Sequence, residues 1–152
     1  MTRTLYMTDH NKMSGFGYVA DKVCDGLARK YGPNEVWLLG WGLKSSEPIN
    51  RGSYGVLSCA DHPYGADVLP SVLNQIQPEI LITQDDTRNL LGWFEQFADD
   101  KSRQFHWINY PVVDGYVWQK NGSKTKWPSN WVEFMKKADY TVAMSEFGGK
   151  IL

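Results

Sequence analysis

The feature that most restricts the fold of this chain is a regular alternation between short apolar runs and segments with apolar residues at helical spacing. Six apolar or β-prone runs are predicted to be strands, at residues 5–8, 35–40, 54–58, 80–83, 105–108 and 140–144. Four segments are predicted to be amphipathic helices, at residues 16–31, 68–76, 90–98 and 131–138. Strands that alternate with helices in this way are typical of right-handed βαβ crossovers. We therefore expect an α/β, Rossmann-like three-layer sandwich with a mainly parallel, doubly wound sheet.

The connection between the second and third predicted strands departs from this pattern. Residues 43–52 have no helical period, so these strands could instead form a hairpin with one antiparallel member. The direction of the strand at residues 53–59 therefore stays open. In the next helix, Pro70 is compatible only with the first turn, and Asp67 is expected to be its N-cap.

Length and composition limit the domain organisation and the class of partner. The 152 residues are enough for one domain, residues 1–152, with its own core. Sixteen basic and seventeen acidic residues give a net charge of −1, which argues against nucleic acid as a partner. The cysteines Cys24 and Cys59 stand apart from any zinc-ligand spacing, so we expect no metal and a reducing, cytoplasmic environment. We expect no signal peptide and no membrane span.

Ligands of doubly wound sheets bind outside the carboxyl ends of the strands, where the strand order reverses. In the usual 3-2-1-4-5-6 order, that point lies between the first and fourth strands. The site residues expected at this edge are His10, Ser14, Gly15, Phe16, Gly17, Asp85, Asp86, Asp114, Ser145 and Glu146. Asp85 and Asp86 could each hold ligand hydroxyls or cap the following helix, and one aspartate could do each.

The loop Ser14–Gly17 opens a predicted helix. Its N–H groups and the helix dipole could receive a phosphate or sugar oxygen. Alternatively, the glycines could serve only to allow a tight turn, since the segment matches neither the dinucleotide-binding nor the P-loop fingerprint.

The histidines and tryptophans allow both structural and ligand roles. His106 is predicted to be a packed core residue, whereas His10, at a strand end, could contact ligand. Tryptophans in predicted loops are the better candidates for a ligand or partner surface. They are Trp41, Trp118 and Trp127.

Taken together, these segments resemble the N-terminal domain of a retaining GT-B glycosyltransferase of the glycosyl transferase group 1 type. The resemblance covers nearly the whole chain and depends on the order and spacing of its parts. The parts are SGFG at 14–17, EVWLLG at 35–40, YG at 64–65, QPEILI at 77–82, YPVVDG at 110–115 and ADYTVAMSEFG at 138–148.

The resemblance implies that this chain is the acceptor-side half of a GT-B architecture. A second, donor-binding domain, expected to be absent from this chain, would bind the nucleotide-sugar and supply a pair of glutamates. The resemblance also implies that Asp114 approaches the reacting sugar, and with His10 it is our catalytic candidate. We assign such groups to orienting hydroxyls and phosphate, because in a retaining transfer the donor phosphate can itself take the acceptor's proton.

The function expected from this resemblance is sugar transfer from a nucleotide-sugar to an acceptor hydroxyl, with no cofactor beyond the nucleotide-sugar co-substrate. One alternative is a non-enzymatic carbohydrate- or nucleotide-binding module. Another is a nucleotide- or flavin-binding protein unrelated to sugars, against which the missing phosphate-loop and dinucleotide fingerprints argue. A homo-oligomer, and a peripheral membrane contact made only by a full-length protein, stay open.

Overall fold

A seven-stranded sheet forms the middle layer of the computed structural model, which describes residues 2–59, 61–113, 117–118, 124–125, 127–146 and 149. The strands are β1 (Thr4–Asp9), β2 (Val36–Trp41), β3 (Ile49–Asn50), β4 (Gly55–Ser58), β5 (Ile80–Asp85), β6 (His106–Pro111) and β9 (Tyr140–Thr141). A separate antiparallel pair is formed by β7 (Val117–Trp118) and β8 (Lys124–Thr125), within a segment that the sequence predicts to be a loop.

The strand order is β3-β4-β2-β1-β5-β6-β9, and every neighbouring pair is parallel except β3 with β4. The six predicted strands therefore follow the expected order 3-2-1-4-5-6. The strand at residues 55–58 runs parallel to β2, so the alternative of a hairpin between the second and third predicted strands is wrong. The antiparallel member is instead the two-residue β3, which pairs with the outer side of β4.

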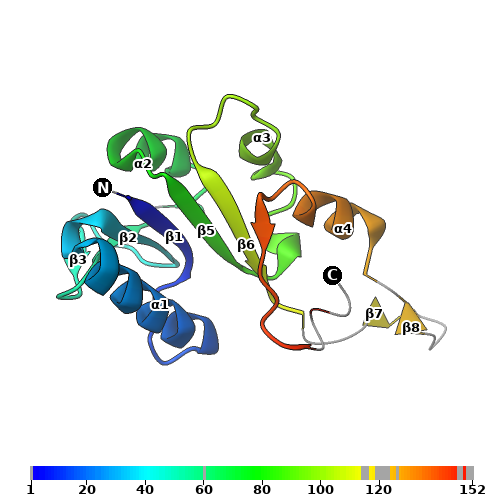
Figure 1. The fold of residues 1–152 in the computed structure, drawn as a ribbon, viewed down its shortest axis with the longest axis horizontal. Helices are drawn as coiled ribbons and strands as arrows, with labels where there is room; N and C mark the ends of the chain where they lie inside the picture. The colour runs from blue at the N-terminus through cyan, green and yellow to red at the C-terminus, as the bar shows by residue number, and fades with distance from the viewer. Residues whose placement is uncertain are drawn as a thin grey trace.

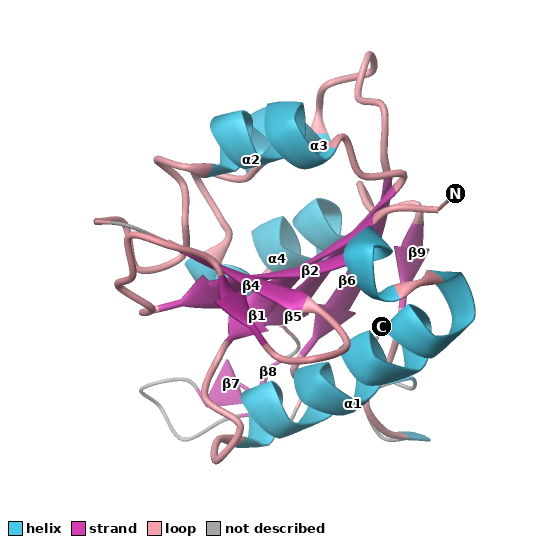
Figure 2. Ribbon diagram, turned by 90° about the vertical axis from the view of Figure 1, so that its left-hand side faces the viewer, coloured by secondary structure: helices cyan, strands magenta, loops and turns pink. Residues whose placement is uncertain are grey.

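Helices cover both faces of this sheet, which gives the three layers of a Rossmann-like α/β fold (Figures 1 and 2). The 17-residue helix α1 (Gly15–Tyr31) lies on one face, which we call the α1 face. The other face, which we call the α2 face, packs against the remaining helices. They are α2 (Leu69–Ile76), α3 (Glu95–Ala98) and α4 (Ser129–Met135), with short 3-10 turns η1 (Pro33–Glu35) and η2 (Thr87–Asn89) before β2 and after β5.

The core follows from strand periodicity, because alternate side chains of a strand point to opposite faces. In β1, Leu5 and Met7 pack on the α2 face, and Tyr6 packs between them on the α1 face. The α2 face is rich in aromatic residues: the rings of Phe94 and Trp107 lie 4.9 Å apart, centroid to centroid. Both faces of the central strands are buried, as the continuous apolar runs predict.

The predicted helix at residues 90–98 is much shorter than expected. Gly92 has a φ of +86°, a left-handed conformation that a continuous α-helix excludes, so only Glu95–Ala98 is helical. Pro70 lies in the first turn of α2, as predicted. Asp67, however, is not the N-cap of α2: its carboxylate accepts hydrogen bonds from the backbone N–H groups of Asp61 and His62.

The final helix and strand are also displaced or shortened relative to the prediction. α4 ends at Met135, and the chain then turns back toward β6. There the carboxylate of Asp139 accepts hydrogen bonds from the Trp107 backbone N–H (2.6 Å) and from the Arg103 guanidinium (2.8 Å).

No helix in the part of the chain that the structure describes is both long and apolar enough to cross a membrane.

Candidate functional site

The carboxyl ends of the parallel strands form one edge of the sheet, at the lower end of β5 and β6 in Figure 1. The strand order reverses between β1 and β5: β1 leads to α1 on one face, and β5 leads to η2 and α3 on the other. Chains leaving neighbouring strands in opposite directions open the crevice in which doubly wound proteins bind ligands. The β1/β5 pair is therefore the candidate site, as the sequence predicts.

The loop after β1 is held mainly by its own hydrogen bonds. Ser14 is the N-cap of α1: its hydroxyl accepts from the Gly17 N–H (3.0 Å) and donates to the Asn11 carbonyl (2.9 Å). A Cβ on Gly17 would lie 2.1 Å from that same carbonyl oxygen, so Gly17 serves the close approach of the loop to the helix. Gly15, in contrast, has nothing within 4 Å of its Cβ position.

His10 is tied to the neighbouring strand. Its Nδ1 lies 2.8 Å from the carbonyl oxygen of Trp41, and because a carbonyl only accepts, Nδ1 must donate the proton. Nε2 of the neutral ring is then an acceptor, on a side chain that is about a quarter exposed (26%). The Arg51 guanidinium donates to the backbone carbonyl of His10 (3.1 Å) and so connects the segment between β3 and β4 to the loop after β1.

Asp85 and Asp86 have different environments, although they are adjacent. Asp86 is the N-cap of η2: its carboxylate accepts from the Arg88 N–H and pairs with the Arg88 guanidinium (3.0 Å). Asp85 is buried at the end of β5 with only 4% of its surface exposed, and its Oδ2 has no hydrogen-bond partner among the residues that the structure describes. Burial raises the pKa of Asp85 to about 6, although hydrogen bonds from the Asn89 side chain and the Asp86 backbone oppose the rise.

Further buried polar atoms near this edge lack partners among the described residues. Buried polar groups are normally hydrogen-bonded, so such a concentration marks a place where a ligand or water is expected. Four such atoms mark that place on the α2 face: Trp41 Nε1, Asp85 Oδ2, Thr87 Oγ1 and Asn109 Nδ2. Thr8 Oγ1 and Gln84 Nε2 are also unpartnered, but they lie on the opposite, α1 face and are not counted in this cluster. Of these residues, the sequence identified Asp85 as a site residue and Trp41 as a candidate for a ligand or partner surface.

The structure separates the remaining predicted site residues. Ser145 and Glu146 are exposed and follow β9, which is two strands away from β5. Asp114 lies outside the described residues, so its catalytic role stays a prediction. The ligand contacts predicted for Ser14–Gly17 and for Asp86 also stay predictions.

Two predictions about aromatic and histidine side chains are wrong. Trp41 and Trp127 are each only 7% exposed, so they are not surface platforms. The Trp41 indole packs edge-on against Tyr64, with ring centroids 5.3 Å apart. His106 is exposed rather than packed in the core, because it is the first residue of β6 and lies at the open end of the sheet.

His62 is a residue whose environment the sequence did not reveal. Its Nδ1 accepts from the backbone N–H groups of Tyr64 and Ala66, both at 3.2 Å, so the ring proton is on Nε2. The ring also lies edge-on to Trp93, at 5.5 Å between centroids. It thereby joins the segment after β4 to the segment after β5.

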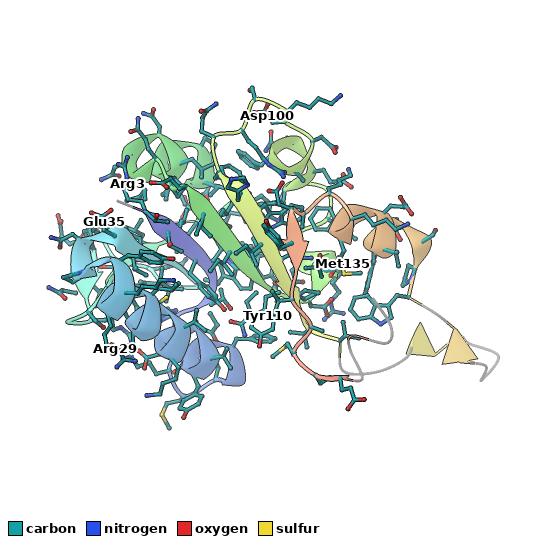
Figure 3. The ribbon with its side chains drawn as sticks, viewed as in Figure 1. Arg3, Arg29, Glu35, Asp100, Tyr110 and Met135 are labelled. Atoms are coloured by element: carbon teal, nitrogen blue, oxygen red, sulfur yellow. The ribbon has the colours of Figure 1, made fainter. Side chains whose placement is uncertain are left out.

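A cavity of about 610 Å³ lies at the opposite, amino end of the sheet, between α2 and the segment before β6. Figure 3 shows the separation: Asp100, which lines this cavity, is labelled at the other end of the sheet from Tyr110. The charged groups of its lining are engaged within the protein. Arg103 donates to Ala98 and Asp139, and Asp100 accepts from Ser102. Size alone therefore does not make it the better candidate.

Metal binding and thiol chemistry each require particular arrangements of acidic, histidine or cysteine side chains. The described residues contain no group of three or more His, Cys, Asp or Glu side chains arranged to hold a metal ion. Cys24 and Cys59 are free and buried on opposite faces of the sheet, and burial raises the pKa of each thiol to about 12. Neither thiol is therefore a nucleophile at neutral pH.

The fold and the β1/β5 edge define the chain as a Rossmann-like α/β protein with a candidate ligand site at the strand-order reversal. No protein-family model matches the chain, and no curated protein sequence matches it.

Proposed function

We propose that this chain is the acceptor-side half of a retaining GT-B glycosyltransferase, which transfers a sugar from a nucleotide-sugar to an acceptor hydroxyl. The observation that carries this proposal is the buried Asp85 carboxylate, with one oxygen unpartnered, at the strand-order reversal beside the loop that opens α1. A buried carboxylate with an unpartnered oxygen can accept a hydrogen bond from a ligand hydroxyl. The resemblance of the ordered segments along the chain to this family supplies the reaction.

Each group at the edge has a role that fits its hydrogen-bonding capacity. Asp85 Oδ2 accepts from a sugar hydroxyl, and because His10 Nδ1 donates to Trp41, Nε2 is a second acceptor in the neutral form of the ring. The first N–H groups of α1, at Gly15 and Phe16, precede the first intrahelical bonds and are oriented to receive a phosphate or sugar oxygen. Gly15 leaves the approach to them open, since its Cβ position faces empty space.

The proposed reaction balances without a base from this chain. The bond between the anomeric carbon and the diphosphate oxygen breaks, and the acceptor oxygen forms the new bond on the same face of the sugar. The acceptor's proton passes to the departing diphosphate. Asp85 and His10 then act by orienting hydroxyls, a contribution that comes from proximity rather than proton transfer. Asp114 and Asp86 remain candidates for orienting hydroxyls in the same way.

The test is an NMR titration of the ¹⁵N-labelled chain with UDP-glucose, GDP-mannose and methyl α-D-glucopyranoside. Backbone amide shifts are expected at the carboxyl edge, around Gly15 and Asp85. Asp85→Asn should weaken binding about tenfold, the equivalent of one charge-assisted hydrogen bond. Asp100→Asn, the same change at the opposite end of the sheet, should leave binding within about twofold of wild type.

Two outcomes would contradict the proposal. One is a response confined to the cavity at the amino end of the sheet, and the other is no response to any of the three compounds. Glycoside binding at the carboxyl edge, combined with no transfer when the chain is joined to a donor-binding domain, would favour the non-enzymatic carbohydrate-binding module.

A further inference from the structure

Asn109 belongs to a chain of hydrogen bonds that determines which end of its side-chain amide is free. The indole N–H of Trp107 donates to the Thr83 hydroxyl oxygen (2.9 Å), and that hydroxyl lies 3.1 Å from Asn109 Oδ1. An indole N–H can only donate, so Thr83 Oγ1 accepts from Trp107, and its own proton is donated to Asn109 Oδ1. The NH₂ end of the Asn109 amide is then turned away from Thr83.

This NH₂ group has no hydrogen-bond partner among the described residues, although Asn109 is only 1% exposed. Leaving a buried donor unpaired costs about 1–3 kcal/mol in general. The Trp107–Thr83–Asn109 chain thus holds a free donor in a position where the protein itself does not use it. Three fully buried residues keep this arrangement in one geometry.

An unpartnered acceptor lies on the same face of the sheet, on the neighbouring strand. The β5/β6 register pairs Thr83 with Asn109 and Asp85 with Pro111, so Asn109 and Asp85 are diagonal neighbours on the α2 face. Diagonal neighbours on one face of a sheet are separated by about 7–8 Å, a gap that leaves room for a bridging group between two short side chains. Asp85 contributes the unpartnered Oδ2, from a side chain that is 4% exposed.

We infer that Asn109 and Asp85 together form a subsite that binds one neutral hydroxyl group of a polyol ligand. The inference rests on the proposed function and names the chemical group that the β5/β6 part of the site takes. The hydroxyl oxygen accepts from Asn109 Nδ2, and the hydroxyl proton is donated to Asp85 Oδ2. Thr87 Oγ1, also buried and unpartnered, lies two residues beyond Asp85 and can contact a neighbouring hydroxyl.

The pairing of donor and acceptor excludes charged groups. A carboxylate or the diphosphate of a nucleotide-sugar can only accept, so it would match Asn109 but meet repulsion from the Asp85 carboxylate. Inorganic phosphate keeps an O–H group, but its negative charge meets the same repulsion. An ammonium group can only donate, so it would match Asp85 but leave the Asn109 NH₂ unpaired. A hydroxyl satisfies both, because it donates one hydrogen bond and accepts others. The nucleotide phosphates are therefore expected near α1 and not here.

The side-chain amide of Gln84 provides a matched control inside the same molecule. Gln84 is also fully buried, its oxygen accepts from the Tyr6 hydroxyl (2.8 Å), and its Nε2 is also unpartnered. It lies one residue before Asp85 but on the α1 face, where no carboxylate accompanies it among the unpartnered atoms. The two amides therefore differ in the feature that the inference requires: Asn109 shares its face of the sheet with the unpartnered Asp85 carboxylate, and Gln84 does not.

The experiment follows the side-chain NH₂ signals of Asn109 and Gln84 by NMR during titration with methyl α-D-glucopyranoside. The Asn109 signals are expected to shift in a saturable manner, and the Gln84 signals to stay in place. Inorganic phosphate and methylammonium, at the same concentrations, should leave Asn109 unaffected. No shift of the Asn109 signals, equal shifts of both amides, or an equal response to phosphate would each overturn the inference.

Two matched variants test the same subsite by affinity. Asn109→Leu should weaken glucoside binding about tenfold, as expected for loss of one hydrogen bond with its partner left unpaired. Gln84→Leu likewise deprives one hydroxyl, that of Tyr6, of its acceptor, but this variant should bind the glucoside within about twofold of wild type. Backbone shifts at Gly15 with an unresponsive Asn109 amide would overturn the inference but still support the proposed function. If either variant fails to fold, the wild-type amide signals decide.

Discussion

Asp85 and Asp86 show that a shift of one position along the chain gives two identical side chains different roles. Asp86 has left the strand, so its carboxylate turns back to cap η2 and to pair with Arg88. Asp85 is the last residue of β5, and strand alternation directs its side chain into the packed α2 face. The buried one retains an unpaired oxygen and a raised pKa, which are the properties of a group kept for a ligand.

Asp85→Asn is expected to stabilise the protein at neutral and alkaline pH. The folded-state pKa of about 6 lies above the unfolded value near 3.8, so the folded protein holds this proton more tightly. Its stability therefore falls as the pH rises from about 4 to about 6 and stays lower above that. The variant lacks this ionisation and should be more stable by on the order of 2 kcal/mol at pH 8.

Urea unfolding of both proteins from pH 4 to pH 8 measures this difference. The stability gap between Asp85→Asn and wild type should be small at pH 4 and should grow until about pH 7. Asp100→Asn is the control: hydrogen bonds from Ser102 lower the pKa of Asp100, so both folded and unfolded states are ionised from pH 5 upward and its gap should stay constant. A gap for Asp85→Asn that does not depend on pH would contradict the assignment.

At the scale of elements, α1 is held by hydrogen bonds from the segment that connects β2 to β4, where a doubly wound fold would usually have a helix. The β2–β4 crossover has no α-helix of its own, and its connecting segment is bonded directly to α1. The Tyr54 hydroxyl donates to Asp21, and the Ser53 hydroxyl donates to Asp25, both at 2.7 Å. With Arg51 bonded to the His10 carbonyl, this segment also holds the loop after β1. The segment between β3 and β4 therefore holds both α1 and the loop after β1 in position.

The glycines of the loop that opens α1 are expected to respond very differently to substitution. Gly17→Ala would place a Cβ 2.1 Å from the Asn11 carbonyl oxygen, so backbone must move, and we expect a loss of about 2 kcal/mol or more in the free energy of unfolding. Gly15→Ala meets nothing within 4 Å and should be neutral or stabilise by up to about 1 kcal/mol.

Chemical unfolding of the two variants beside wild type provides the measurement. Because both are the same change within the first turn of one helix, propensity cancels in the comparison and the difference reports the contact with Asn11. Equal stabilities of Gly17→Ala and Gly15→Ala would show that the loop is not seated as described.

At the scale of the whole molecule, the proposed function requires two walls around the reacting sugar. A departing nucleoside diphosphate and an oxocarbenium-like transition state need stabilisation from both sides of a closed cleft. The described residues supply one wall, at the β1/β5 edge. The purified 152-residue chain is therefore expected to show little or no sugar transfer, whatever its affinity for glycosides.

Transfer of radiolabelled sugar from UDP-glucose or GDP-mannose to methyl α-D-glucopyranoside checks this expectation. The control is the Asp85→Asn chain purified in parallel, because a contaminating enzyme would give the same background in both samples. Robust turnover by the wild-type chain, absent from the variant, would show that one domain suffices and would refute the two-wall reasoning.

Much of the fold could be predicted because its elements follow local patterns. Runs such as 80–83 are continuously apolar, and burial on both faces follows directly from that. The helix at 90–98 could not be predicted correctly, since its apolar spacing gives no sign that Gly92 adopts a left-handed conformation. His106 was misplaced for a related reason: it belongs to a strand, but only the sheet shows that this end of the strand is open.

The sequence by itself determined the α/β class, the order of strands and helices along the chain, and that Asp85 and the Ser14–Gly17 loop each follow a buried strand, because apolar periodicity is a local property. Tertiary structure decided which aspartate is free and which is a cap, and that Gly17 is needed for close packing. It also brought Trp107, Thr83 and Asn109 into one chain of hydrogen bonds. The physical reason is that desolvation and hydrogen-bond pairing depend on neighbours distant in sequence, which only the packed sheet brings together.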